Sequence, residues 1–506
     1  MAVLAYRGDI RRLSCDAWYL PGDFRPHFAP YWFKDDLELR AAADDLREFP
    51  ENWGEDGTRV VALQLTDRRR ATPVLAAIPL RGTDDWAYHR ETLRQFTALA
   101  RTLPRPEHLQ TRPRRLLAVP LIGTGLSTWQ PSSAAHVKGL LDALHEESAA
   151  GDVDFALVLR SEVSWAATQA LRRQRVAERG PDPELADVLG EAKALAAQAR
   201  SGKLVLFTGA GISQPAGLPD WRGLLVQLAY EAKFEAEAVE RLTEMPLLDQ
   251  AALIARRTGE AQLADRVAEV MTAPHHALGH GLLANLPVRE TVTLNYDGLF
   301  EMAAAGASAP VSVLPYEPAQ DRWLLKLHGC IEPERRHDIV LTRNDYLSLG
   351  EHRATLTGLV QAMLVTRHML FVGFGLGDDH LHAVVYDVRR ALGQGRLGKL
   401  GTALVLDRDP LLEELWQDDL YFVPMEGARP EAARRLDLFL DHVLLLATTS
   451  DQHLFDPAFA GLLTPDEVRL RNLLHTAFDR QSPGEGSSWL RVLKVLEELG
   501  WGRSAR

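Results

Sequence analysis

The chain of 506 residues is long enough for two or three domains, and its 46% hydrophobic and 25% charged residues are ordinary for globular protein. A net charge of −12 argues against non-specific nucleic-acid binding, which needs a basic surface. The two cysteines, Cys15 and Cys330, cannot build a disulfide framework or a four-cysteine zinc site. We therefore expect a cytoplasmic protein. It has no signal-peptide pattern, and its most apolar late segment, 438–448, is too short to span a membrane.

Residues 1–175 form the first predicted domain, in which strands and helices alternate. Apolar runs of strand type occur at 3–7, 13–18, 60–65, 74–80, 116–121 and 155–159. Helical spacing of apolar residues predicts helices at 86–103 and at about 133–147. This alternation is typical of an α/β domain with a largely parallel sheet.

Two short glycine-containing pieces stand out in this domain. Gly8-Asp9-Ile10 precedes an apolar strand that contains Asp16, and the strand at 116–121 ends in Gly123-Thr124-Gly125. Both pieces resemble the macro-domain family, which has a glycine loop around a diphosphate at the second position. The resemblance implies a site for ADP-ribose or a related nucleotide, formed by Asp9, Ile10, Gly123, Thr124 and Gly125. The family's asparagine-rich loop is absent, which counts against ligand hydrolysis. The alternative is a plain α/β domain whose glycines only turn the chain.

A charged segment with glycine and prolines at 173–183 predicts a domain boundary. An amphipathic helix at 185–199 then opens the second predicted domain, 185–447, which carries a helical insert at about 223–290. Residues 448–506 are predicted to form a helical C-terminal tail. An apolar stripe in its last helix can serve assembly, although packing on its own domain is the commoner reason for such a stripe.

The second domain is organised around strands that end in glycine-rich or polar turns. These turns read Gly209-Ala210-Gly211-Ile212-Ser213, Asn295-Tyr296-Asp297, His328-Gly329 and Gly373-Phe374-Gly375-Leu376-Gly377-Asp378. In a parallel sheet the carboxyl ends of the strands meet at one edge, where ligands bind. The first glycines let the backbone approach a pyrophosphate, and free N–H groups at the next helix start can face the phosphates. Ordinary turn formation is the alternative for the Asn and Asp.

One further piece, Pro219-Asp220-Trp221-Arg222, follows the first glycines. Together with the strand ends it resembles the sirtuin family, whose motifs read G-A-G-x-S, G-I-P-D-F-R, T-x-N-x-D, H-G and G-x-S-x-x-D in the same order. This chain departs from them with Leu218 for Ile, Trp221 for Phe and Gly375 for Ser. The resemblance covers residues 185–447.

The resemblance implies a Rossmann-like domain that takes NAD as its substrate, without a metal, and cleaves the nicotinamide–ribose bond. Cleavage builds positive charge on the ribose, and neutral nicotinamide leaves without a strong acid. Asn295 would hold the ribose hydroxyls and a water, His328 would act as general base, and Asp297 would stabilise positive charge. The NAD-binding residues implied are Gly209, Ala210, Gly211, Ser213, Asp220, Trp221, Arg222, Gly373, Gly375 and Asp378.

The positions at which this chain departs from the family indicate which of the family's activities it is expected to have. The zinc module of the deacylases cannot exist with two cysteines, and Leu294 stands where deacylases usually have Gln. With water as nucleophile, the products are nicotinamide and ADP-ribose or cyclic ADP-ribose. Zinc-less sirtuin-like domains occur in bacterial antiphage proteins that deplete NAD, so the resemblance implies a homo-oligomeric defence effector with a phage-derived trigger. The alternatives are a non-catalytic NAD or ADP-ribose sensor and an ADP-ribosyltransferase or unusual deacylase.

Overall fold

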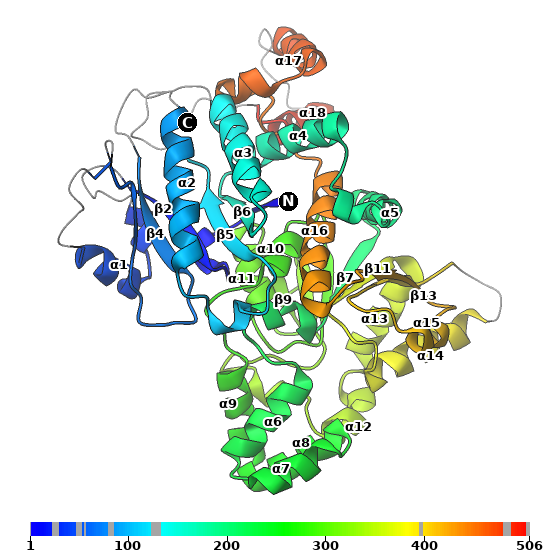
Figure 1. Ribbon diagram of the computed structural model, residues 1–506. Coiled ribbons are helices and arrows are strands. Elements are labelled where there is room, and N and C mark those ends of the chain that lie inside the picture. The colour runs from blue at the N-terminus through cyan, green and yellow to red at the C-terminus, as the bar shows by residue number, and fades with distance from the viewer. Residues whose placement is uncertain are drawn as a thin grey trace. The chain divides into compact units, whose positions relative to one another are not determined.

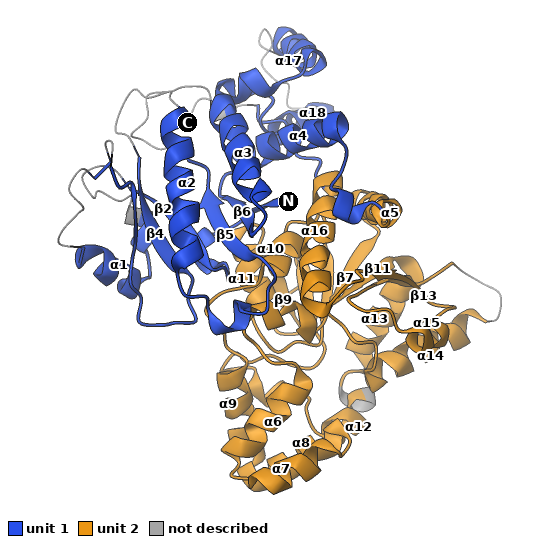
Figure 2. Cartoon of the chain, viewed as in Figure 1, with its two compact units in different colours: residues 1–186, 448–506 blue, residues 187–447 orange. Residues whose placement is uncertain are grey.

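The computed structural model describes residues 2–22, 30–46, 53–54, 57–78, 86–122, 133–393, 398–478 and 487–501. The chain forms two compact units (Figure 2). The first unit comprises residues 1–186 together with 448–506, and the second comprises 187–447. The middle of the chain is thus a unit of its own, inserted between the two parts of the other.

The first unit is built on a six-stranded sheet with the order β1-β6-β5-β2-β4-β3. Its strands are β1 (Val3–Arg7), β2 (Ala17–Gly22), β3 (Val60–Ala62), β4 (Thr72–Ala77), β5 (Arg115–Pro120) and β6 (Val153–Leu159). All neighbours are parallel except β3 and β4. The helices are α1 (Leu37–Asp44), α2 (Trp86–Thr102), α3 (Ser133–Ala149) and α4 (Glu162–Arg179), and α2 and α3 cover one face of the sheet (Figure 1).

The C-terminal segment, for which the sequence predicted a helical tail, is assigned to this first unit. The short 3-10 helix η8 (Pro457–Leu462) packs on α3 and α4. The Arg173 guanidinium on α4 donates to the Thr448 carbonyl at 3.2 Å. Helices α17 (Pro465–Phe478) and α18 (Ser487–Glu498) follow, around a small core with Leu454, Phe455 and Leu496. Burial of these apolar side chains explains why the segment belongs to a folded unit.

The second unit contains seven parallel strands with the order β13-β12-β11-β7-β8-β10-β9. The strands are β7 (Leu204–Thr208), β8 (Glu290–Thr293), β9 (Ser312–Leu314), β10 (Trp323–Lys326), β11 (His368–Val372), β12 (Gly401–Val405) and β13 (Leu420–Pro424). The chain starts in the middle at β7, moves outward through β8 to β10, and crosses back to β11 on the other side of β7. Apart from β9 at the edge, this is the Rossmann strand order, with its switch point between β7 and β11.

Helices cover both faces of the second sheet. On one face lie α5 (Leu189–Arg200), α10 (Leu278–Ala284), α11 (Leu299–Gly306) and α16 (Arg429–Ala447). On the other face, α13 (Ala354–Thr366) and α14 (Asp379–Leu392) form an apolar core with β7 and β11. Helices α6 (Trp221–Glu231), α7 (Ala236–Thr243), α8 (Leu247–Thr258) and α9 (Glu260–Val270) form a lobe with its own apolar core (Figure 1). The remaining helices are α12 (Arg343–His352) and α15 (Pro410–Leu415).

The prediction of an α/β fold with parallel sheets and a helical insert is confirmed. Strands such as β7 and β11 consist mostly of buried apolar residues, which is expected for parallel strands covered on both faces. Among the described helices, none combines the length and the hydropathy needed to cross a bilayer.

Candidate functional site

Strand register places the predicted motifs at one edge of the second sheet. Thr208 on β7 pairs with Val372 on β11 and with Thr293 on β8, and Thr293 pairs with Lys326 on β10. The motif residues that follow these paired positions are, in strand order, Gly373, Gly209, Asn295 and His328. The structure therefore brings together the turns that the sequence singled out, at the switch point where ligands bind in this strand order.

Two of the glycine turns interlock. The N–H of Gly211 donates to the Gly373 carbonyl at 2.8 Å, and the N–H of Gly209 donates to the Val372 carbonyl at 3.0 Å. A Cβ on Gly209 would lie 2.6 Å from the Gly373 oxygen, and Gly373 has a φ of +64°. The close contact between the two loops thus requires glycine at both positions, whether or not a phosphate also approaches them. By contrast, a Cβ on Gly375 would meet nothing within 4 Å.

A buried polar cluster lies beneath these turns. The Ser213 hydroxyl donates to Asp297 Oδ2 at 2.9 Å. The Asn295 amide Nδ2 donates to the Gly209 carbonyl at 3.1 Å and to Ser213 Oγ at 3.3 Å. His280, on α10, completes the cluster with Nε2 3.3 Å from Ser213 Oγ. Ser213 is fully buried, and its hydroxyl contacts both Asn295 and Asp297, so it helps to orient these two side chains.

Asp297 is held in place from two sides. Its Oδ1 accepts the N–H of Leu299 at the start of α11, at 3.0 Å, and its own carbonyl accepts from the Lys326 ammonium at 2.6 Å. Lys326 is completely buried on β10 and forms an ion pair with Glu301 at 2.7 Å. Burial raises the pKa of Asp297, against the opposing effect of Lys326. One signal in the sequence marks Lys326, because it is a charged residue inside an apolar strand, but the sequence-based prediction did not include it.

Asp220, Trp221 and Arg222 lie at the start of the helical lobe. Asp220 is the N-cap of α6, and its Oδ1 accepts the N–H of Gly223 at 2.8 Å. Trp221 is half-buried and stacks on Tyr346 of α12, with ring centroids 5.8 Å apart. Arg222 is exposed and has a long contact with the Thr243 carbonyl, at 3.5 Å. Asp220 therefore caps α6, and any contact with a ligand would be in addition to this structural role.

His328 is buried among side chains that come from α12 and α14. Its Nδ1 lies 3.5 Å from the Tyr346 hydroxyl, and its ring stacks on that of His380 at 5.9 Å. Burial lowers the pKa of His328 to about 4, opposed by Asp378 and assisted by His380 and Arg353. The imidazole is neutral at physiological pH, which is the form a general base requires. Tyr346 and His380 are site residues that sequence reasoning missed.

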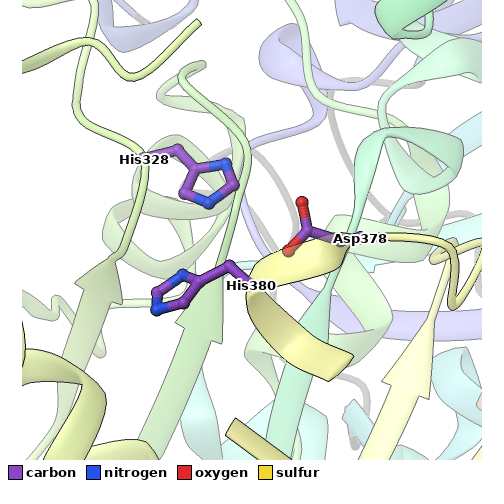
Figure 3. A group of neighbouring side chains, drawn as sticks. All are labelled: His328, Asp378 and His380. Atoms are coloured by element: carbon purple, nitrogen blue, oxygen red, sulfur yellow. The ribbon is translucent and has the colours of Figure 1, made fainter. Parts of the chain in front are cut away.

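One group among the described residues has the spacing of a metal site (Figure 3). His328, Asp378 and His380 each offer a ligand atom, and these atoms lie within 4.8 Å of one another. Both Asp378 oxygens already accept hydrogen bonds, from the Tyr346 hydroxyl at 2.8 Å and from the Leu381 N–H at 3.0 Å. His380 Nε2 lies 3.0 Å from the Thr357 hydroxyl. Hydrogen bonds within the chain account for this arrangement, and we assign it no metal.

The predicted nucleotide site of the first unit falls only partly on described residues. Asp9 caps a short 3-10 turn, and its carboxylate forms a two-pronged ion pair with Arg11, at 2.6 Å for Oδ2 and Nη2. Ile10 is buried. Gly123, Thr124 and Gly125 lie outside the described residues. A ligand at this position would therefore contact an Asp9 carboxylate that is already paired with the Arg11 guanidinium.

The strand order and the polar edge can be compared with known families. Residues 289–423 match the family described as "SIR2-like domain". All of the matched residues lie in the second unit. The matched stretch runs from β8 to β13, so it includes Asn295, Asp297, His328 and Asp378. The glycine turn after β7 and the whole helical lobe, α6 to α9, precede it.

The chain is also similar to bacterial proteins that are named NAD hydrolases. The chain is 27% identical over 197 residues to "NAD(+) hydrolase ThsA" of Cytobacillus dafuensis, covering 37% of this chain and 38% of that one. It is 28% identical over 192 residues to the protein of that name from Acinetobacter baumannii, covering 36% and 39%. It is 26% identical over 206 residues to "Defense-associated sirtuin 2" of Bacillus subtilis, covering 39% and 20%. The matches span less than half of each relative.

Two solved structures show weak likeness. A Trypanosoma brucei macrodomain in complex with ADP-ribose has a TM-score of 0.23 at 17% identity, covering 32% of this chain and 66% of that one. A Sir2 histidine-to-tyrosine mutant with a p53 peptide and NAD has a TM-score of 0.22 at 17% identity, covering 46% and 91%. These scores are too low to bear on the fold of either unit.

Proposed function

We propose that this chain is an NAD glycohydrolase, which cleaves NAD to nicotinamide and ADP-ribose or its cyclic form. The observation that carries the proposal is the polar edge of the second sheet, where Asn295, Asp297 and His328 follow adjacent strands. His328 Nε2 is buried and accepts no hydrogen bond from any described residue, as expected for a base that awaits its substrate. The relatives named NAD(+) hydrolase support the same chemistry.

In the proposed reaction the bond between ribose C1′ and nicotinamide breaks, and its electron pair leaves with the nicotinamide nitrogen. Positive charge develops on the ribose, and the buried carboxylate of Asp297 stabilises it. Asn295, whose amide is fixed by Gly209 and Ser213, holds the ribose hydroxyls. As a water oxygen bonds to C1′, His328 Nε2 takes the proton that the water releases.

A role in antiphage defence belongs to the same proposal, and a relative named a defense-associated sirtuin supports it. The substrate would be the cytoplasmic NAD pool. Residues 1–175 would form a sensor domain with an ADP-ribose-type ligand at Asp9 and Ile10, while a homo-oligomer and a phage-derived trigger would control the activity.

The test is NAD consumption by the purified full chain, with products separated by chromatography. We expect the wild type to release nicotinamide, and Asn295→Ala and His328→Ala to lose roughly 100-fold or more in rate, the usual scale of a lost acid–base group. The matched controls are Asn472→Ala and His337→Ala, both exposed in the structure, which should retain activity. Loss in the controls, or full activity in the site variants, would contradict the assignment.

The co-product distinguishes hydrolysis from cyclisation. NAD binding without turnover, in vitro and in cells during phage infection, would instead support the sensor alternative, because a sensor leaves the NAD pool intact. Acyl-lysine peptides and protein acceptors in parallel reactions test the deacylase and transferase alternatives.

A further inference from the structure

Tyr346 connects residues from three of the predicted motifs. It lies on α12, outside every motif, and its hydroxyl donates to Asp378 Oδ2 at 2.8 Å. The same hydroxyl lies 3.5 Å from His328 Nδ1, and the edge of one ring faces the other at 5.2 Å. The Tyr346 ring also stacks on the Trp221 ring. Tyr346 is thus fixed in position by contacts on several sides.

The direction of these hydrogen bonds follows from the number of protons available. A phenol has one proton, and a carboxylate can only accept, so the Tyr346 proton lies toward Asp378. Asp378 is itself fixed, because its other oxygen caps α14 through the Leu381 N–H. The lone pairs of the Tyr346 oxygen then face His328 Nδ1. They favour the tautomer in which Nδ1 carries the proton and donates it to Tyr346.

We propose that Tyr346 is a positioning residue, which couples Asp378 to His328 and holds the imidazole in its Nδ1–H tautomer. The lone pair of His328 is then on Nε2, the buried nitrogen without a partner among the described residues. The distance of 3.5 Å is long for a hydrogen bond, as is often found for catalytic hydrogen bonds before substrate binds. The catalytic consequence rests on the proposed NAD hydrolysis, whereas the tautomer itself does not.

During the proposed reaction the relay stabilises the charge that forms. When Nε2 takes the proton from water, the imidazole becomes a cation with a proton on each nitrogen. The Nδ1 proton stays hydrogen-bonded to Tyr346, whose own proton stays on the bond to the Asp378 carboxylate. The negative charge of Asp378 is thereby coupled to the cation without leaving the cap of α14. This is the logic of a base oriented by a carboxylate, with a tyrosine between them.

The decisive measurement is the 15N spectrum of the His328 imidazole, which distinguishes the two neutral tautomers and is assigned by its loss in His328→Ala. We expect Nδ1–H in the wild type. Tyr346→Phe keeps the ring and its stack but removes the hydroxyl, so the Nδ1–H preference should be lost. Asp378→Asn keeps a helix cap, yet its amide can donate to Tyr346, which then donates to Nδ1 and reverses the tautomer to Nε2–H.

The matched control is Tyr386→Phe, at an exposed tyrosine of α14. It should leave the spectrum and the unfolding temperature unchanged. An unchanged tautomer in both Tyr346→Phe and Asp378→Asn would overturn the proposal, whether or not the protein cleaves NAD. If only one variant folds, its spectrum suffices to decide.

Kinetics then test the consequence for catalysis. We expect Tyr346→Phe to lower kcat roughly 10- to 100-fold, part of the usual value of a general base, with KM for NAD changed less than about 2-fold. In the His328→Ala background the same substitution should have no further effect on kcat. A separate, additive loss there would show that Tyr346 does not act through His328.

Discussion

His280 is a buried imidazole that resists protonation. It is 1% exposed, lies against Ser213, and burial lowers its pKa to about 3. In the unfolded chain a histidine titrates near pH 6.5, so below about that pH the unfolded state takes a proton that the native state refuses. Native stability is therefore fully present above about pH 6.5 and falls as the pH is lowered toward the native pKa. His328, with its lowered pKa, contributes in the same direction.

This gives a prediction for pH-dependent stability. Between pH 7 and pH 5 we expect His280 alone to account for a loss of about 2 kcal/mol in the free energy of unfolding. His280→Gln, which can still contact Ser213, should have a correspondingly smaller loss in urea titrations at the two pH values. His337→Gln, at an exposed histidine, should match the wild type. Equal pH dependence in His280→Gln and wild type would contradict this account.

Lys326 contributes a charge to the core beneath the site. Its ammonium holds the Tyr296 and Asp297 carbonyls at 3.2 and 2.6 Å and pairs with Glu301. Burial alone would lower the pKa of Lys326, but Glu301, Cys330 and Asp297 together outweigh it and the pKa is raised. Lys326→Met leaves the Glu301 carboxylate without its partner, so we expect a cost of about 3–5 kcal/mol.

Urea unfolding of a series of variants tests this role. Adding Glu301→Gln to Lys326→Met should recover part of the stability, because it removes the unpaired charge. Lys203→Met, at an exposed lysine just before β7, is the control and should be nearly neutral. If the single Lys326→Met variant is as stable as the control, the buried pair is not what holds the Asn295–Asp297 turn.

At the scale of elements, the turns after β7 and β11 act as one unit because their backbones touch. An alanine at Gly373 would require the left-handed conformation and would clash with the Ile212 N–H. We expect Gly373→Ala to cost about 1–3 kcal/mol and to raise KM for NAD, since the strained loop moves away from the proposed phosphate site. The control is Gly190→Ala on α5, where a Cβ meets nothing within 4 Å and helix propensity favours alanine.

Urea titrations and NAD kinetics on the two glycine variants decide the matter. Equal stability of Gly373→Ala and wild type would show that the loops can separate without cost.

The elements that sequence could predict are those with strong local patterns. Strands β7, β8, β10 and β11 appear directly before the glycine-rich or polar turns, where the sequence predicted strands. The short edge strand β9 was not predicted. Strand β13 was not predicted either, because its buried and exposed positions do not follow a regular alternation. Tyr346 could not be found, because its role depends on a tertiary fold that places α12 beside the turns after β10 and β11. The motif residues, by contrast, were marked by their place at strand ends.

At the scale of the whole molecule, the two units differ in the number of chain segments that form them. The second unit is one continuous stretch, 187–447. It contains a complete sheet, an apolar core packed against that sheet and a second apolar core in the helical lobe. The first unit needs two separated stretches, because η8 of the C-terminal segment packs on α3 and α4. Arg173 adds a hydrogen bond to Thr448 and an ion pair with Asp451. A separate compact core allows a continuous unit to fold alone, whereas a divided unit requires both of its parts.

We therefore predict that fragment 187–447 unfolds in urea with a single cooperative transition, while fragment 1–186 alone is destabilised. Adding a peptide of residues 448–506 should raise the unfolding midpoint of fragment 1–186. The same peptide with Phe459→Ala should do so less, because Phe459 is the buried side chain of η8 and its loss costs about 3–5 kcal/mol. An unchanged midpoint with the wild-type peptide would mean that residues 1–186 fold without the returning segment. The C-terminal helices would then be an appendage of the first unit and not part of its core.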